Sequence, residues 1–229
     1  EPPETPYPMT TGGANQWSLS TWALYRRGGA AQGIAPNGQL GGSQAGMRLQ
    51  RRLFSASQRT SALANLRISM PLAGRSEQEA AIGISFTRVG AIPLELLVER
   101  RIAIGRAARS AFAVIAVTGI NDAALPLSFR LNGYAQAGMV GVRSRDGFID
   151  GALRVERVVG DLEGARLELG VGAWGAAQPG VSRLDLGPSA ALRFRLGRAS
   201  LRASAEWRER IAGQARPGSG PALTLGVDY

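Results

Sequence analysis

The side chains of this chain that could do chemistry are arginines and carboxylic acids. All 27 basic residues are Arg and 17 residues are Asp or Glu, with no Lys, His or Cys, so the net charge is +10. The missing residue types exclude disulfides, thiol nucleophiles, zinc sites of Cys or His, and catalysis by His. The guanidinium that remains suits forked contacts with carboxylates and phosphates. We therefore expect no metal, no cofactor and no enzyme activity, and a role in which Arg meets anions.

These charged residues recur at every second position, opposite apolar residues. In residues 200–211 one face reads Leu-Ala-Ala-Trp from position 201, and the other reads Arg-Ser-Glu-Arg-Arg from position 202. A period of two predicts β-strands. Turn signals such as Pro36-Asn37-Gly38 and Gln178-Pro179-Gly180 separate the alternating segments. The predicted strands are 16–27, 39–54, 61–73, 78–89, 93–105, 111–119, 126–141, 148–159, 165–176, 181–197, 199–211 and 221–229.

The length of these strands, about 9–17 residues, decides between two all-β architectures. A soluble sandwich or soluble barrel gives the same alternation, but a strand of about 9–11 tilted residues crosses a bilayer. The polar faces are rich in Gly, Ser and Arg–Glu pairs, as an enclosed lumen requires. The aromatic residues that lie near strand ends, as in interfacial girdles, are Trp17, Tyr25, Phe86, Phe194, Trp207 and Tyr229. The sequence thus favours one antiparallel up-and-down transmembrane β-barrel of about twelve strands.

The domain organisation follows from composition. Residues 1–14 are Pro-rich and predict an extended tail or linker, and residues 15–229 form the barrel. No run of about 18 apolar residues is present, so a helical membrane span is excluded. Because an open sheet edge is untenable in hydrocarbon, the barrel must close. An even strand number puts both barrel termini on one side, which we assign to the periplasm.

The last eight residues, Ala222-Leu-Thr-Leu-Gly-Val-Asp-Tyr229, resemble the closing strand of Gram-negative outer-membrane proteins. That resemblance implies an outer-membrane location, contact with outer-membrane lipid, and Tyr229 as the signal read by the barrel-insertion machinery. Barrel size and Arg content are similar to small twelve-stranded channels for acidic oligosaccharides. The phrases Leu94-Glu-Leu-Leu-Val-Glu-Arg-Arg101 and Gly187-Pro-Ser-Ala-Ala-Leu-Arg-Phe194 resemble the barrels of exopolysaccharide-secretion porins. Neither family aligns strand by strand, so no functional residue is carried over.

Assigning faces by parity predicts the lining of the lumen. The arginines predicted to point inward are Arg48, Arg52, Arg67, Arg101, Arg130, Arg154, Arg166, Arg183, Arg193, Arg195, Arg202, Arg208 and Arg210. The acids on the same faces are Glu95, Glu99, Asp150, Glu156, Glu168, Asp185, Glu206 and Asp228. Either Arg–Glu ladders simply cross-link strands and fill the lumen, or the surplus of Arg makes a path for anions. Two arginines break the parity, Arg100 and Arg157, which requires an interfacial position or a β-bulge.

Other motifs have a structural and a functional interpretation. Gly170-Val-Gly-Ala-Trp-Gly175 matches G-x-G-x-x-G but lies inside a strand, which favours close packing over a dinucleotide site. Glu95 and Glu99 share a face with Arg101 and are better explained as ion-pair partners than as an acid/base pair. Trp22 and Trp174 point inward and either stack on sugar rings or fill the lumen. The arginines are spread along the chain rather than clustered with aromatics, so we expect no nucleic-acid partner.

Two functions are predicted from these features. The first is an outer-membrane channel for passive passage of anionic solutes, or of saccharide or exopolysaccharide chains. The second is a non-conducting barrel that anchors or assembles a periplasmic or surface protein complex. A continuous path through the lumen favours the first, and interlocked Arg–Glu pairs across it favour the second.

Overall fold

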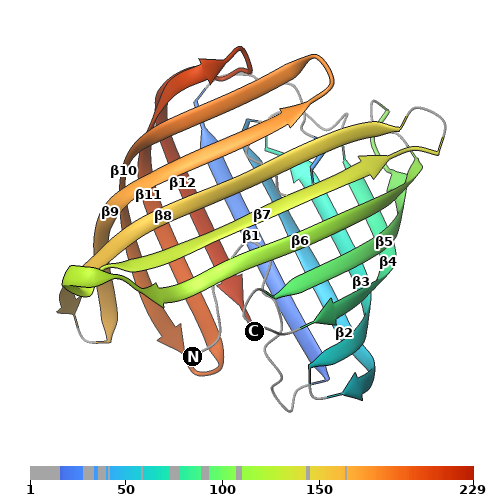
Figure 1. The fold of residues 1–229 in the computed structure, drawn as a ribbon, viewed down its shortest axis with the longest axis horizontal. Helices are drawn as coiled ribbons and strands as arrows, with labels where there is room; N and C mark the ends of the chain where they lie inside the picture. The colour runs from blue at the N-terminus through green and yellow to red at the C-terminus, as the bar shows by residue number, and fades with distance from the viewer. Residues whose placement is uncertain are drawn as a thin grey trace.

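The computed structural model describes residues 16–27, 34–35, 40, 42–57, 59–72, 78–88, 93–106, 110–142, 145–162 and 164–229. Twelve antiparallel strands form one closed barrel in which each strand pairs with its neighbours in sequence (Figure 1). The strands are β1 (Trp17–Arg26), β2 (Gln44–Ser57), β3 (Thr60–Pro71), β4 (Glu79–Arg88), β5 (Leu94–Ala103), β6 (Ala111–Ala124), β7 (Arg130–Val140), β8 (Asp146–Leu162), β9 (Ala165–Gln178), β10 (Val181–Leu196), β11 (Ala199–Gly213) and β12 (Gly220–Asp228). The predicted all-β barrel is confirmed.

The barrel closes where the first strand meets the last. In the β1–β12 register Trp22 lies opposite Gly226. Beyond the ladder, Leu19 N–H donates to the Tyr229 carbonyl at 3.0 Å and Tyr229 N–H donates to the Leu19 carbonyl at 2.8 Å. No edge strand is therefore left open, as a bilayer requires. We call the end at which β1 begins and β12 ends the terminal end, and the opposite end the distal end.

Apolar side chains cover the outside of the barrel. Leu96, Val98 and Leu225 are each 46–49% exposed, whereas charged residues of opposite parity such as Glu95 and Glu99 are 1–2% exposed. A soluble sandwich would bury the first set, so the alternative of a soluble β protein is wrong. Exposed aromatic residues lie near the terminal end (Trp17, Phe54, Phe86, Tyr229) and towards the distal end (Tyr25, Phe112, Trp207). This apolar belt with aromatic borders is typical of a membrane barrel.

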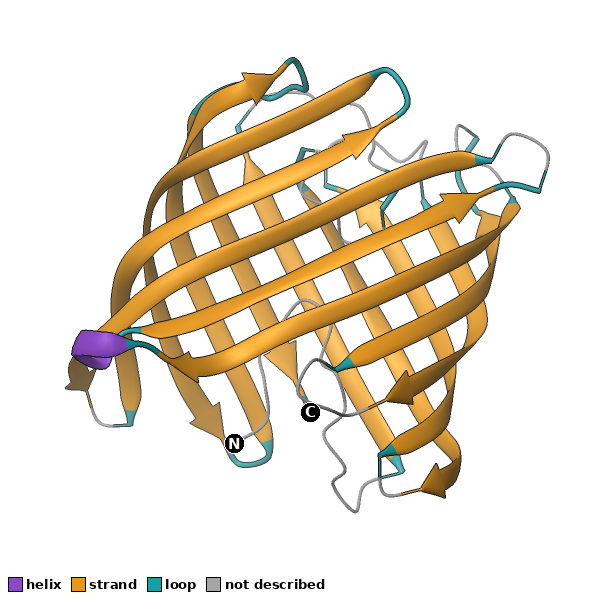
Figure 2. Cartoon of the chain, viewed as in Figure 1, coloured by secondary structure: helices purple, strands orange, loops and turns teal. Residues whose placement is uncertain are grey.

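The described residues contain one helical element, the short 3₁₀ turn η1 (Pro126–Ser128), at the terminal end between β6 and β7 (Figure 2). None of the described helical residues forms a helix long and apolar enough to cross a membrane.

Most strand boundaries agree with the sequence prediction, and the differences have local causes. β6 continues to Ala124, five residues beyond its predicted end, because its register shifts between Ile120 and Ala123 and Asp122 has a φ of 49°. Such a bulge breaks the alternation from which the boundary was predicted. β7 begins at Arg130 because the turn η1 takes up the residues predicted as its start. The predicted tail, 1–14, and most of the predicted loop 28–38 lie outside the described residues.

The two arginines that break parity are both on the outer surface. Arg100 is exposed and its guanidinium lies 4.8 Å from the centroid of the Phe112 ring, near the distal end. This is the interfacial position that a charged side chain on the lipid face needs. Arg157 is also exposed and directly precedes a register shift between Val158 and Gly160.

The glycine motif of β9 reflects close packing. A Cβ built on Gly170 would lie 2.0 Å from the Val155 carbonyl oxygen and 2.7 Å from the Glu156 Cα. Because these are backbone atoms, the strand itself would have to move.

We expect Gly170→Ala to lower the free energy of unfolding by about 1–3 kcal/mol through this overpacking. Gly226→Ala is the matched control, since a Cβ there meets nothing within 4 Å. Urea titration of the folded barrel in lipid vesicles measures both changes. Equal losses for the two variants would contradict the packing explanation.

Candidate functional site: an arginine-rich lumen

The charged residues of the barrel are gathered on its inner face. Among the predicted lumen residues, the structure buries Trp22, Arg48, Arg67, Arg101, Trp174, Arg183 and Arg208 to 8% exposure or less. Arg52, Arg154, Arg193, Arg202 and Arg210 are half-buried. The acids Glu95, Glu99, Asp150, Glu156, Asp185 and Glu206 are buried with them. Buried charges are stable only when they are paired. The described pairs form three groups and a further contact between Arg48 and Glu95.

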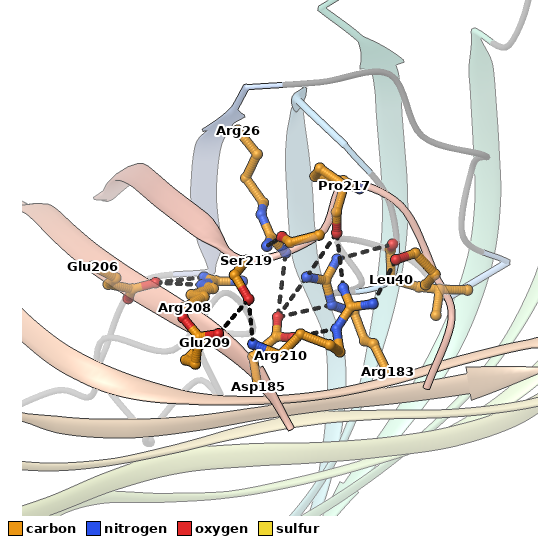
Figure 3. Close-up of polar contacts among 12 residues, drawn as sticks. Arg26, Leu40, Arg183, Asp185, Glu206, Arg208, Glu209, Arg210, Pro217 and Ser219 are labelled. Atoms are coloured by element: carbon orange, nitrogen blue, oxygen red, sulfur yellow. Dashed lines mark hydrogen bonds and ion pairs between the residues drawn. The ribbon is translucent and has the colours of Figure 1, made fainter. Parts of the chain in front are cut away.

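The first group, which we call the mouth cluster, lies at the distal end and consists of Arg26, Arg183, Arg210 and Asp185 (Figure 3). Asp185 is fully buried and receives the guanidinium groups of all three arginines, with N–O distances of 2.7 Å to Arg210 and 3.5 Å to Arg26. Among the residues that the structure describes, these three cations share one carboxylate, which leaves two positive charges uncompensated.

The mouth cluster also holds the chain that connects β11 to β12. Arg210 Nη1 donates to the Ala215 carbonyl at 2.6 Å, and its Nη2 donates to the Pro217 carbonyl at 2.8 Å. Arg26 Nη2 donates to the Gly218 carbonyl at 3.2 Å. Since carbonyl oxygens carry only partial charge, these contacts orient the guanidinium groups without neutralising them.

The second group surrounds Trp174 deeper in the barrel. Glu206 accepts from Arg154 Nη2 at 2.9 Å and from Arg208 Nε at 2.8 Å. Both guanidinium groups also lie over the Trp174 ring, at 5.7 and 4.6 Å from its centroid. Trp174 is fully buried. Its ring is therefore covered by protein in this structure, an arrangement that holds β8, β9 and β11 together.

Towards the terminal end the same wall continues with two more arginines. Arg202 donates from Nη2 to Glu156 at 2.7 Å, and Arg193 donates from Nε to Glu168 at 2.9 Å. The Arg202 and Glu156 pair joins β11 to β8, three strands apart in the barrel.

The third group lies on β3–β5. Glu99 accepts from Arg67 Nη2 at 2.9 Å and from Arg101 Nε at 2.8 Å, so this acid is an ion-pair partner. Glu95 is 3.9 Å from Arg48 and accepts from Gln50 at 3.4 Å.

A part of the inner face is apolar, which sequence analysis missed. We call it the apolar wall; it comprises Leu97, Ala111, Ala113, Ile115, Val117, Tyr134, Val140, Phe148, Ala152 and Trp174. Ala35 and Ile34, which belong to the segment between β1 and β2, pack against it inside the barrel. β6 is apolar on both faces, so its sequence does not indicate which of its residues point inward. The lumen is therefore amphipathic.

Some predicted lumen residues lie away from these groups. Arg130, Arg166 and Arg195 are exposed and lie near the terminal end. Arg130 contacts Asp122 at 3.5 Å, with both side chains about half exposed. Conversely, Arg26 was not predicted but is 2% exposed inside the mouth cluster. Its parity with Trp22 could have identified it.

Known proteins resemble this chain in fold rather than in sequence. No protein-family model matches the sequence, and no curated protein matches it significantly. An outer-membrane channel of Pseudomonas putida F1 superposes with a TM-score of 0.54 at 10% identity, over 97% of this chain and 98% of that one. A bacterial polysaccharide outer-membrane secretin gives 0.44 at 7% identity, over 95% and 99%. The outer-membrane channel DcaP of Acinetobacter baumannii gives 0.42 at 12% identity, over 94% and 71%.

The fold is that of a Gram-negative outer-membrane β-barrel. The predicted resemblance and the outer-membrane location agree with this fold and with the exposed apolar belt.

Proposed function

We propose that this barrel is a passive outer-membrane channel whose Arg-rich lumen favours small anionic solutes, acidic saccharides among them. The mouth cluster carries the proposal, because its two uncompensated positive charges lie at one end of the lumen. With the termini in the periplasm, this cluster faces the outside and meets the solute first. Fixed charge at a constriction raises the local concentration of counter-ions and excludes ions of like charge.

The course of the ion pairs supports a path rather than a plug. Four of the described ion pairs reach furthest around the barrel, each joining strands three apart among twelve: Arg26 with Asp185, Arg48 with Glu95, Arg154 with Glu206, and Arg202 with Glu156. They span a quarter of the circumference and follow the wall.

Conductance in a planar bilayer under a KCl gradient tests the proposal. We expect discrete channel currents and a reversal potential whose sign shows that chloride permeates better than potassium. A cation preference would contradict the role assigned to the arginines.

A second candidate, a non-conducting barrel that anchors a protein complex, is favoured by the depth at which these pairs are buried. Arg208, Asp185 and Trp174 each have an exposure of 0%. Complete absence of current from a correctly folded barrel would support this candidate.

We also propose that Tyr229 is the signal read by the insertion machinery. Its backbone closes the ladder with Leu19 while the residue is 57% exposed, so the ring is accessible for recognition. We expect Tyr229→Ala to lower the amount of barrel in the outer membrane several-fold and Tyr229→Phe to leave it unchanged. Heat-modifiable migration on SDS gels measures the folded fraction. Equal folding of both variants from urea into detergent separates recognition from stability, and normal insertion of Tyr229→Ala would refute the assignment.

A further inference from the structure

One arginine of the lumen borders the apolar wall. Arg101 on β5 lies opposite Ala111 of β6, and Glu99 lies opposite Ala113 in the same register. Ala111 and Ala113 both belong to the apolar wall. A buried cation and an apolar surface thus adjoin each other inside the barrel.

Arg101 has donor capacity left after it has paired with two acids, Glu99 and Glu79, whose Oε1 atoms lie 2.8 and 3.9 Å from its Nε. It is 4% exposed, and its Nε donates to Glu99 at 2.8 Å. Its Nη1 donates to the backbone carbonyl of Ile34 at 2.7 Å, whereas its buried Nη2 has no hydrogen-bond partner among the residues that the structure describes. A buried N–H without a partner costs free energy, so it marks a position at which an acceptor is favoured.

Ile34 shows what fits this place. Its carbonyl oxygen accepts from Arg101, its N–H donates to Gln178 Oε1 at 2.6 Å, and its side chain packs on the apolar wall. The residue therefore presents an oxygen to the guanidinium and a branched hydrocarbon to the wall. A carboxylate would improve on the carbonyl, since its two oxygens match the forked geometry of Nη1 and Nη2 and carry full charge.

We propose that Arg101 and the apolar wall form a binding site for small carboxylates with a branched apolar tail, and that Ile34 occupies this site when no solute is bound. The proposal rests on the channel function, because it names the solute class that the lumen selects. Arg101 binds the carboxylate, and the part of the apolar wall beside it, Ala111, Ala113 and Val140, binds the tail. A saccharide acid without an apolar part uses only half of this site.

Isothermal titration calorimetry of the folded barrel in non-ionic detergent tests the site, with 4-methylpentanoate as the probe. We expect 4-methylpentanoate to bind at least about tenfold more tightly than acetate, which lacks the tail, and than 4-methylpentanamide, which lacks the charge. These comparisons use the unaltered protein, so they do not depend on any variant folding. Equal binding of the three compounds, or no binding of any, would overturn the proposal.

Three substitutions sharpen the assignment. Arg101→Gln is expected to weaken 4-methylpentanoate binding about tenfold, whereas Arg100→Gln, its exposed neighbour on the lipid face, leaves it unchanged. Ile34→Gly removes the competing side chain and is expected to tighten binding several-fold. Unchanged affinity in Arg101→Gln, or weaker binding in Ile34→Gly, would refute the site. Binding without channel current would refute the channel but keep the site; current without binding would do the reverse.

Discussion

Replacing Glu206 with Gln is expected to lower the free energy of unfolding by about 3 kcal/mol. Glu206 is 4% exposed and is the shared acceptor of Arg154 and Arg208. The amide keeps the shape of the side chain but leaves two guanidinium groups in the lumen without their countercharge. The cost of an uncompensated buried charge exceeds that of a lost hydrogen bond. Urea titration in vesicles, followed by tryptophan fluorescence, measures the change.

The control for Glu206→Gln is the same kind of substitution in an ion pair that is exposed to solvent. Asp122 and Arg130 are 3.5 Å apart with side chains 54% and 48% exposed. Asp122→Asn is expected to change stability by less than about 0.5 kcal/mol, because solvent screens exposed pairs. If the two substitutions cost the same, the lumen is hydrated throughout and the ion pairs do not hold the barrel together.

The second large effect concerns ion selectivity. The double substitution Arg26→Gln and Arg210→Gln removes both uncompensated charges of the mouth cluster and keeps the Arg183–Asp185 pair. We expect the ratio of chloride to potassium permeability to fall several-fold and the reversal potential to move towards zero. Planar-bilayer recordings under a KCl gradient provide the measurement.

A matched control removes the same charge from the outer surface. Arg100→Gln with Arg157→Gln alters two exposed arginines that lie outside the lumen. Selectivity is expected to stay unchanged in this variant. A similar shift in both double variants would show that the total charge of the protein, rather than the mouth cluster, sets the preference.

Much of the fold could be predicted because strands of a membrane barrel are regular. Alternation in 199–211 and 221–229 reports directly which residues face lipid, and β11 and β12 follow it closely. The predicted end of β6 was wrong because the bulge after Ile120 breaks the alternation of apolar and polar residues. Arg26 was not predicted to face the lumen. It is the last residue of β1 and is followed by Arg27, so the alternation of inward and outward residues is hard to follow there.

The candidate site was less predictable than the fold. Parity could place Arg101 inside, but the partner that it meets, Ile34, comes from a connecting segment far away in sequence. The apolar wall could not be predicted from the sequence, because Ala111, Ala113 and Ile115 alternate with residues that are equally apolar. Charge pairing across three strands, as in Arg154 with Glu206, depends on barrel curvature, which no local pattern encodes.

The central claim is that apolar side chains face lipid while polar and charged ones face the lumen, and a cysteine scan of β12 tests it most directly. The chain has no native Cys, so each introduced thiol is unique. Nitroxide labels placed singly at residues 222–227 are expected to alternate: oxygen dissolved in lipid relaxes labels at Leu223, Leu225 and Val227 much more strongly than those at Ala222, Thr224 and Gly226. Uniform accessibility, or an alternation of the opposite sign, would contradict the account.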